Sequence, residues 1–390
     1  MRILVTSHGR HPCPGGVDTY IRSITKALEA RGHAVDLLCF SNIDILPDES
    51  LVKLERIWEE LVNKLGKTVG KAFLENELLR YTHEELLRHT DISKYDIIHS
   101  QFGITSHAAK RVYPEVPLVG TIHSCFYSEA LHSDIVPESD KALFLRFDKQ
   151  AVSCPTTVIT VSSLINKEMP PIPKEKHEII YNGIDTDVFR PKLRTKDLVR
   201  IATAGGIFHH KGYDTLIEAL TLLKNGGMLK NKFELTMFGN GDGLPALRSM
   251  VEERSLPVKF AGEVSRNTLA MELPNFDIFV QPSRLDNFPF SVIEAMACGC
   301  VPIGSRVGGI PEQIDHMKNG VLVEPENILE LAEALRLLIQ NPLLREELGH
   351  QAWFAALNRF SLTRMGERLE EVYQKTIVKH PARHPALRPA

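Results

Sequence analysis

The sequence predicts an α/β protein with two doubly wound domains, each built on a mostly parallel sheet. Its 390 residues exceed one ordinary core, since a domain takes about 100–200 residues. Short apolar runs alternate with amphipathic helical patterns, which is typical of βαβ units. This alternation occurs twice, before and after a turn-rich stretch that contains Asn182-Gly183 and Pro191.

The first series opens with a strand pattern at residues 2–7, a glycine loop and an amphipathic helix over 18–32. Further strands are predicted at 34–40, 96–100, 117–123 and 156–162. The second series has predicted strands that begin at residues 200, 234, 258, 277, 301 and 320. Predicted helices separate them at 213–226, 245–254, 291–299 and 329–340.

These patterns give the expected domain boundaries. Residues 1–178 form the first domain, with a helical insertion at about 48–90, and residues 179–358 form the second. A C-terminal helix at 359–378 is expected to cross back to the first domain, and the Pro-rich tail 379–390 is expected to be disordered. The insertion carries a leucine stripe with balanced charge, which favours helices packed on the first domain over a membrane- or acceptor-docking surface.

Composition excludes several classes of protein. The chain is 43% hydrophobic and 24% charged with a net charge of −3, so it lacks the basic surplus of a nucleic-acid-binding protein. No apolar run reaches the ~18 residues of a membrane span, and the N-terminus has no signal-peptide pattern. The six cysteines are scattered, which favours reduced thiols. We therefore expect a cytoplasmic protein, with at most peripheral contact at the inner membrane face.

Ligands in open α/β sheets bind beyond the carboxyl ends of the strands, so we expect the site in a cleft between the two domains. Gly15-Gly16 follows the first strand and can bring backbone amides to an anion, or can form a simple tight turn. The dinucleotide spacing G-x-G-x-x-G is absent there, so NAD binding is not supported. "GNGDG" at 239–243 is a second glycine loop, for which nucleotide contact and a plain turn both stay open.

A cationic group follows the first strand of the second domain. Lys211 stands at a helix entry, where an ammonium can neutralise charge on a phosphate leaving group or can simply be solvated. The adjacent His209-His210 has no further ligands at metal-binding spacing, and His8, His11 and Cys13 are expected to be loop residues.

"SRLDNFPFSVIEAMACG" at 283–299 places Asp286 at the end of a strand and Glu294 in the helix that follows. Pro289 suits the first turn of that helix, where its missing N–H costs nothing. Carboxylates accept hydrogen bonds from sugar hydroxyls, and amides at a helix N-terminus donate to phosphate. A plain capping acid and a surface acid are the alternatives for Asp286 and Glu294.

The stretch "PSRLDNFPFSVIEAMACGCVPIGSRVGGIPE" resembles the signature of the retaining glycosyltransferases of family 4, which have the GT-B fold. Here it is a D-N-F-P variant of the E-x7-E pattern. "PCPGGVDTYIRSITKALEARGHAV", "GTIHS", "VITVSS", "YNGIDTDVFRP", "HHKGYDTLIEAL" and "FGNGDG" are similar to other family segments and come in the family's order. The resemblance covers residues 1–375 and implies a GT-B fold.

The resemblance implies roles for individual residues. The implied catalytic residues are His123 on the donor sugar, Lys211 on the diphosphate and Asp286 on the sugar hydroxyls. Glu294 would bind the ribose, and Val264 would meet the base through its backbone. The implied donor-binding residues are Gly15, Gly16, Gly206, Val264, Phe288, Phe290, Ser291 and Glu294.

Three departures from the family pattern bear on the donor sugar. Gly206 replaces the usual arginine, which leaves Arg200 and Arg284 as candidates to compensate. Asp286 is one methylene shorter than the usual glutamate, and Pro289 removes one amide donor.

The predicted function is a retaining glycosyltransferase (EC 2.4) that moves a sugar from a nucleotide-diphosphate sugar to an acceptor hydroxyl. UDP-sugar is the first expectation for the donor and GDP-sugar the second; the acceptor would be a polysaccharide, a glycolipid or a small-molecule glycoside. The resemblance implies no cofactor and no metal, and the D-x-D tripeptide Asp185-Thr186-Asp187 belongs to the linker motif. A GT-B epimerase and a non-catalytic nucleotide-sugar-binding protein are the alternatives, and the chain is expected to be a monomer or a homodimer.

Overall fold

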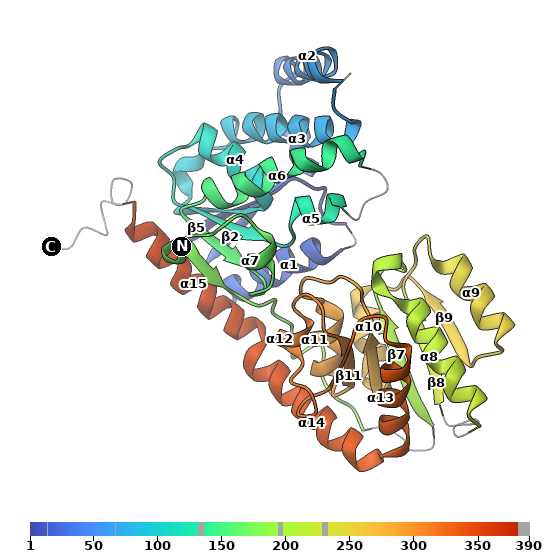
Figure 1. Cartoon of the computed structure of the whole chain (residues 1–390). Helices are drawn as coiled ribbons and strands as arrows, with labels where there is room; N and C mark the ends of the chain where they lie inside the picture. Colours follow the sequence, from blue (N-terminus) through green and yellow to red (C-terminus); the bar gives the residue numbers. More distant parts are fainter. Residues whose placement is uncertain (14, 67, 132–135, 194–197, 228–232, 381–390) are drawn as a thin grey trace. The chain divides into compact units, whose positions relative to one another are not determined.

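The computed structural model describes residues 1–13, 15–66, 68–131, 136–193, 198–227 and 233–380. Its contacts divide the chain into unit 1, Met1–Tyr181 with Met365–Ala390, and unit 2, Asn182–Arg364. Each unit holds a six-stranded sheet in which the strand pairs run parallel. Both sheets are covered by helices, so the predicted α/β class with two doubly wound domains is confirmed (Figure 1).

Unit 1 has the strand order β2-β1-β3-β4-β5-β6. Its strands are β1 (Arg2–Ser7), β2 (Ala34–Leu38), β3 (Ile97–Gln101), β4 (Leu118–Ile122), β5 (Thr157–Thr160) and β6 (His177–Ile179). Its helices are α1 (Gly16–Glu29), α2 (Asp48–Leu65), α3 (Lys71–Arg88), α4 (Phe102–Val112), α5 (Phe126–Leu131), α6 (Glu138–Ser153) and α7 (Ile165–Glu168). Short 3-10 turns are η1 (Phe40–Ile45), η2 (Ile92–Lys94) and η3 (Lys174–Lys176).

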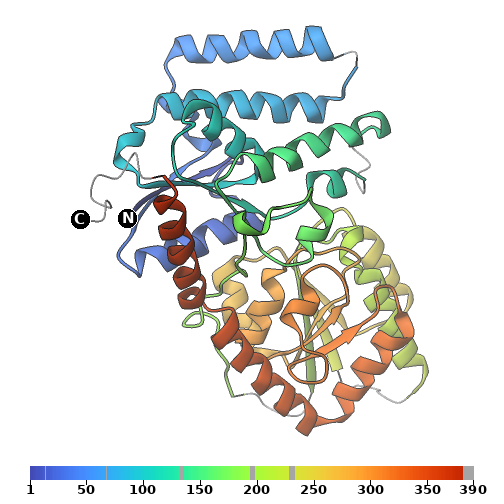
Figure 2. The same cartoon turned by 60° about the vertical axis from the view of Figure 1, so that its left-hand side comes forward.

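Two helices account for the predicted insertion in unit 1. α3 packs on α4 beside the sheet, and α2 lies on α3 as an outer layer (Figures 1 and 2). The two buried residues of α2 are Ser50 and Leu54, whereas α3 buries ten residues. α3 is therefore part of the core, and α2 leaves most of its surface exposed.

The last helix, α15 (Leu362–Val378), joins the sheet of unit 1 through polar contacts. Tyr373 Oη lies 2.7 Å from His99 Nδ1, and Thr376 Oγ1 lies 2.7 Å from Thr157 Oγ1. Tyr373 and Thr376 are both fully buried. The predicted tail lies outside the described residues from position 381 onward.

Unit 2 has the strand order β12-β11-β10-β7-β8-β9. Its strands are β7 (Val199–Ala204), β8 (Phe233–Phe238), β9 (Val258–Gly262), β10 (Ile278–Gln281), β11 (Val301–Ser305) and β12 (Val321–Val323). Its helices are α8 (Tyr213–Asn225), α9 (Leu244–Glu253), α10 (Arg266–Glu272), α11 (Phe290–Ala297), α12 (Ile310–Gln313), α13 (Ile328–Gln340) and α14 (Pro342–Arg359). The 3-10 turns are η4 (His209–Lys211) and η5 (Leu273–Asn275).

Strand order fixes where each unit can hold a ligand. In unit 1 the chain adds β2 on one side of β1 and β3 on the other, so the switch point of the strand order lies between β1 and β3. In unit 2 the switch point lies between β7 and β10. Loops at the carboxyl ends of two such strands diverge and leave a crevice. Among the described residues, no helix has both the length and the apolar character that a membrane crossing requires.

Candidate active site

Two predicted catalytic residues meet at the switch point of unit 2. Lys211 follows β7, Asp286 follows β10, and Lys211 Nζ lies 2.7 Å from Asp286 Oδ2. The two side chains are 19% and 9% exposed, so the pair is partly shielded from water. The structure thus joins an ammonium and a carboxylate whose separation in sequence gives no hint of contact.

The Asp286 carboxylate is fixed by neutral donors as well. Gln281 Nε2 and Ser283 Oγ lie 3.2 and 3.1 Å from Asp286 Oδ2. Gln281 is the last residue of β10, and both it and Ser283 are buried. Sequence reasoning missed both residues, although buried polar side chains at the carboxyl end of a strand are a usable signal.

Two glycines hold the loop after β10 in place. Gly308 has φ 51°, and a Cβ there would lie 1.4 Å from Asp286 O. Gly212 has φ 64°, and a Cβ there would lie 2.1 Å from Pro282 O. Because an added methyl would collide with backbone, both positions require glycine. Gly308, the first glycine of the "GG" pair in the signature, is thus explained by its close approach to the loop that carries Asp286.

Arg284 and Arg200, the two candidates to compensate for the missing arginine, are both held in ion pairs. Arg284 donates to both carboxylate oxygens of Asp214 at 2.8 Å and to Glu326 at 2.8 Å. Arg200 pairs with Glu234 at 3.2 Å. These ion pairs give both arginines a structural role, so neither is available as the expected compensating cation.

Gly206, predicted to bind the donor, lies under an aromatic side chain. A Cβ on Gly206 would approach the Phe208 ring to 2.3 Å. The Phe208 ring in turn stacks on His210, with ring centroids 5.8 Å apart. The position of the expected arginine is therefore covered by Phe208.

The "GNGDG" loop, left open between nucleotide contact and turn, packs against the loop after β7. A Cβ on Gly239 would lie 1.9 Å from Gly205 O, and one on Gly241 would lie 2.4 Å from Ile207 O. Both glycines have positive φ. Close backbone packing accounts for these two glycines.

α11 begins at Phe290, one residue before the predicted start at Ser291. Pro289 is its N-cap rather than a first-turn residue, because φ −64° and ψ 126° are extended. Phe290 and Ser291 are then the first helical residues, and their amides lack acceptors within the helix. Phe288 is buried, and its carbonyl accepts a hydrogen bond from Asn182 Nδ2 at 2.9 Å. The start of α11 is therefore held in place beyond the carboxyl end of β10.

Glu294 lies in the second turn of α11 and is 4% exposed. Its Oε1 accepts a hydrogen bond from Arg266 Nε at 3.0 Å. Burial raises the pKa of the Glu294 carboxyl, and the charge and hydrogen bond of Arg266 partly offset that rise. The half-buried Val264 lies two residues before Arg266, in the loop that precedes α10. Sequence analysis missed Arg266, which is the first residue of α10 and lies outside the signature.

The predicted residues of unit 1 follow β1 and β4. Gly15 is the N-cap of α1, and an added Cβ on Gly15 or Gly16 meets nothing within 4 Å. Both glycines are exposed, so space for a ligand is open there. Gly15 has φ 145°, a conformation that favours glycine.

His123 follows β4 and is enclosed by aromatic rings. The Tyr20 and Phe102 ring centroids lie 4.5 and 5.2 Å from that of His123. Its Nε2 lies 2.8 Å from Gln101 Oε1, an acceptor, which assigns the ring proton to Nε2. Burial, with a smaller effect of His8, lowers the pKa of His123 from 6.5 to about 3. His123 is therefore a neutral imidazole at physiological pH.

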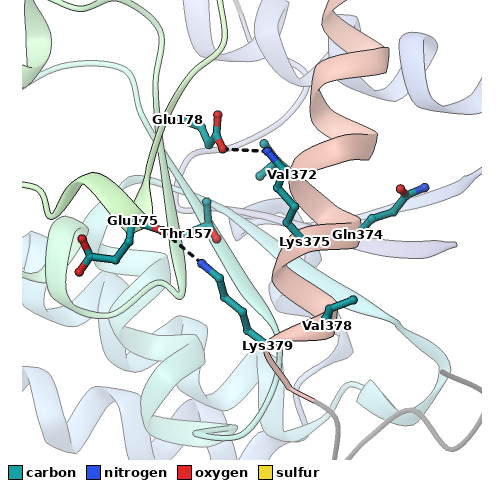
Figure 3. A pocket seen from close by; sticks show the side chains of 8 residues that line it. All are labelled: Thr157, Glu175, Glu178, Val372, Gln374, Lys375, Val378 and Lys379. Carbon is teal, nitrogen blue, oxygen red and sulfur yellow. Dashed lines mark hydrogen bonds and ion pairs between the residues drawn. The ribbon is translucent and has the colours of Figure 1, made fainter. Parts of the chain in front are cut away.

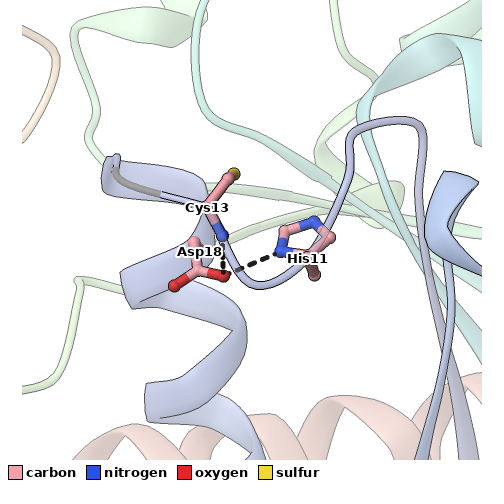
Figure 4. A group of neighbouring side chains, drawn as sticks. All are labelled: His11, Cys13 and Asp18. Carbon is pink, nitrogen blue, oxygen red and sulfur yellow. Dashed lines mark hydrogen bonds and ion pairs between the residues drawn. The ribbon is translucent and has the colours of Figure 1, made fainter.

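A group of possible metal ligands lies in the loop after β1 and the first turn of α1 (Figure 4). Ligand atoms of His11, Cys13 and Asp18 lie within 4.8 Å of one another, the one such group of three among the described residues. Asp18 already accepts from His11 Nδ1 at 3.0 Å, Cys13 N at 3.2 Å and Arg22 Nε at 2.6 Å. Burial, and then the charge of Asp18, raise the pKa of the Cys13 thiol. Because a guanidinium already neutralises Asp18 and the thiol keeps its proton, this group serves as a loop anchor.

The D-x-D tripeptide forms a turn in unit 2. The carbonyl of Asp185 accepts from the Phe189 amide at 2.9 Å, and its carboxylate accepts from the Asp187 amide at 3.2 Å. The turn leads into the buried Phe189, which is 1% exposed. The tripeptide therefore positions a core residue.

A pocket of unit 1 lies near the start of β5, away from the carboxyl ends of the strands that carry the predicted site residues (Figure 3). Its lining is Thr157, Glu175, Glu178, Val372, Gln374, Lys375, Val378 and Lys379. Lys375 pairs with Glu178 at 3.4 Å, and Lys379 donates to the Glu175 carbonyl at 3.2 Å. None of the predicted site residues lines this pocket, and its lysines are already bound to neighbouring oxygens.

Comparison with known proteins agrees with these observations. The family model "Glycosyltransferase Family 4" matches residues 14–188, and "Glycosyl transferases group 1" matches residues 185–353. A D-inositol 3-phosphate glycosyltransferase of Jonesia denitrificans is 26% identical over 93% of this chain and 92% of its own length.

Solved structures show the same fold. Sucrose-phosphate synthase from Thermosynechococcus elongatus superimposes with a TM-score of 0.77 at 19% identity, over 97% of this chain and 99% of that one. Anabaena HepE in complex with UDP-glucose gives a TM-score of 0.69 at 17% identity, over 96% and 100%. With these matches across both units, the chain is a glycosyltransferase enzyme of the GT-B fold, similar to family 4.

Proposed function

We propose that the protein transfers a sugar from a nucleotide-diphosphate sugar to an acceptor hydroxyl with retention of anomeric configuration. A UDP-sugar is the preferred donor in this proposal. The observation that carries it is the Lys211–Asp286 pair at the switch point of unit 2. The ammonium and the carboxylate lie 2.7 Å apart. The ammonium suits the diphosphate on one side of the bond to be broken, and the carboxylate suits the sugar hydroxyls on the other side.

Donor binding would exchange this ion pair for contacts with the ligand. Diphosphate oxygens would accept hydrogen bonds from the Lys211 ammonium, and sugar hydroxyls would donate to the Asp286 carboxylate. Because Gln281 and Ser283 also donate to Asp286, the carboxylate keeps its orientation when Lys211 turns to phosphate. The site would thus be organised before the donor arrives, which limits the cost of reorganisation.

The start of α11 supplies the remaining donor contacts in this proposal. The amides of Phe290 and Ser291 would donate to the sugar and diphosphate, assisted by the positive end of the helix dipole. Glu294 would accept from the ribose hydroxyls, and the backbone at Val264 would meet the base. Phe288 lies in the same loop and would fix the turn rather than touch the donor, since its side chain is buried.

We assign His123 to the transferred sugar and Gly15-Gly16 to the diphosphate. A neutral His123 would hydrogen-bond a sugar hydroxyl through Nδ1, because Nε2 is engaged by Gln101. No carboxylate in this proposal attacks the sugar; the departing diphosphate takes the acceptor proton on the same face. Lys211 would stabilise the negative charge that develops as the diphosphate leaves.

Relatives support the choice of donor class. Anabaena HepE is known in complexes with UDP and with UDP-glucose. We further propose that transfer needs no metal, since Lys211 and the α11 N-terminus supply the positive charge. None of the six cysteines forms a disulfide, which supports a reducing compartment such as the cytoplasm.

The test is incubation with a panel of nucleotide sugars and acceptors, with and without EDTA. We expect nucleoside diphosphate release that EDTA does not change, and a product whose anomeric configuration by NMR equals that of the donor. If no donor and acceptor give nucleoside diphosphate release while the donor still binds, the protein is a binding protein instead. The Phe208 ring over Gly206, in place of the usual arginine, is the observation that favours this alternative. Conversion of the donor sugar without an acceptor would favour an epimerase.

A further inference from the structure

Glu294 and Arg266 form a partly buried contact between two helices of unit 2, α11 and α10. Arg266 is the first residue of α10, and its Nε lies 3.0 Å from Glu294 Oε1. The side chains are 31% and 6% exposed. Among the described residues the contact uses one carboxylate oxygen, Oε1, and leaves Oε2 for a ligand.

Aromatic rings hold the Arg266 guanidinium. Its Cζ lies 5.4 Å from the Phe189 ring centroid and 5.8 Å from that of Phe290. Its Nη2 is buried without a hydrogen-bond partner in the described part of the chain. Cation–π attraction to two rings restricts the guanidinium, so its orientation toward Glu294 is well defined.

We propose that Arg266 is a positioning residue that keeps Glu294 ionised and directs Glu294 Oε2 toward a vicinal diol of the nucleotide. This inference rests on the proposed function, in which Glu294 binds the ribose. An ionised carboxylate accepts hydrogen bonds from both hydroxyls of a diol, whereas a protonated carboxyl must donate one hydrogen bond itself.

Electrostatics explains why a partner is required. Burial favours the neutral form of Glu294, and among the described residues the charge that acts on its pKa is that of Arg266. Without Arg266, a buried carboxylate would lack compensation and would take up a proton more readily. Nucleotide affinity would then fall as pH falls, because binding requires the ionised form.

The experiment compares Arg266→Met with Arg266→Lys, using UDP-glucose as the probe and calorimetry at about pH 6 and about pH 8. The Met variant should bind more weakly at the lower pH, by about tenfold for each unit by which the Glu294 pKa exceeds that pH, and should recover at the higher pH. The Lys variant should lose less. Arg254→Met is the matched control, because Arg254 pairs with Glu218 at 2.6 Å elsewhere in unit 2.

Two further results decide between this role and a merely structural one. In a Glu294→Gln background, Arg266→Met should cause no further loss of affinity for UDP-glucose. A further loss in that background, or an equal loss at both pH values in the single variant, overturns the proposal. A carbon-13 NMR titration of Glu side chains needs no ligand: the Glu294 midpoint must move upward in Arg266→Met, and an unmoved midpoint also overturns it. Failure of the wild-type chain to bind any nucleotide sugar, with the midpoint moved, would instead reject the proposed function.

Discussion

The two units place different chemistry at the carboxyl ends of their strands. At the β7–β10 switch point, unit 2 has the ion pair Lys211–Asp286, and α11 adds the pair of Glu294 with Arg266. At the carboxyl ends of β3 and β4, unit 1 has a neutral His123 bound to Gln101. Sheet topology therefore determines where a site forms, and the loop residues determine whether it supplies charge or neutral hydrogen bonds.

This difference suits the two tasks proposed for the units. A diphosphate leaving group gains negative charge, and fixed cations stabilise that change strongly in a site with little water. A sugar hydroxyl keeps no net charge, so a neutral imidazole can orient it without attracting phosphate. Substitutions in unit 2 should accordingly cost more than those in unit 1.

The largest effect is expected for Lys211→Ala. Removing the cation that stabilises the leaving diphosphate should lower kcat by about 10²–10³-fold, the usual range for one electrostatic group. The measurement is nucleoside diphosphate release at saturating donor. Lys64→Ala is the matched control, since Lys64 also forms an ion pair, with Glu60 at 3.0 Å, but on the exposed surface of α2. A loss below about threefold would remove Lys211 from the catalytic group.

Glu294→Ala should come next, through donor affinity. Charged hydrogen bonds are worth about 1.5–3 kcal/mol, so the Kd for UDP-glucose should rise by about 10–150-fold. Glu234→Ala is the control, because Glu234 forms an exposed ion pair with Arg200 in the same unit. Unchanged affinity in Glu294→Ala would separate this carboxylate from the ribose.

A third effect concerns stability and should distinguish the units by pH. His99 is fully buried, and burial lowers its pKa from 6.5 to about 3. Below pH 6.5 the unfolded chain binds a proton that the folded unit does not, so stability falls as pH decreases from about 6.5 toward 3. At about pH 5 the loss from His99 is about 2 kcal/mol, or about 30-fold in the unfolding equilibrium.

The two tryptophans allow each unit to be followed separately. Trp58 lies in α2 of unit 1 and Trp353 in α14 of unit 2. In Trp353→Phe, the remaining fluorescence reports on unit 1, and its denaturation midpoint should fall with acid. In Trp58→Phe, the midpoint of unit 2 should fall less. Equal acid sensitivity of both units would contradict the role of the buried histidines.

Much of the fold follows from the sequence because periodicity is local. Alternating apolar runs and amphipathic patterns predicted the doubly wound class, and the strands begin within a few residues of their expected positions. α14 was missed because its apolar residues follow no clear helical stripe, although Pro342 marks its first turn. Short helices such as α12 were also missed, since four residues give no periodicity.

The site could be predicted only in part. The signature identified Asp286 and Glu294, but not their partners, which come from other segments of the chain: Lys211 is 75 positions from Asp286, and Arg266 is 28 from Glu294. Such pairs depend on which strands become neighbours. Pattern reasoning likewise could not determine that Arg284 is held by Asp214 and Glu326.

The smallest effect is expected for Gln101→Met, which leaves every charge in place. Loss of the acceptor at 2.8 Å frees the His123 ring proton to occupy either nitrogen. If transfer needs the tautomer that carries the proton on Nε2, kcat/KM should fall by about fivefold, in the range of one neutral hydrogen bond. Nitrogen-15 NMR of His123 should show mixed tautomers in Gln101→Met and one tautomer in the wild-type chain. Mixed tautomers with unchanged kcat/KM would mean that Gln101 serves packing alone, and the neutral site of unit 1 would then act by shape rather than by a directed hydrogen bond.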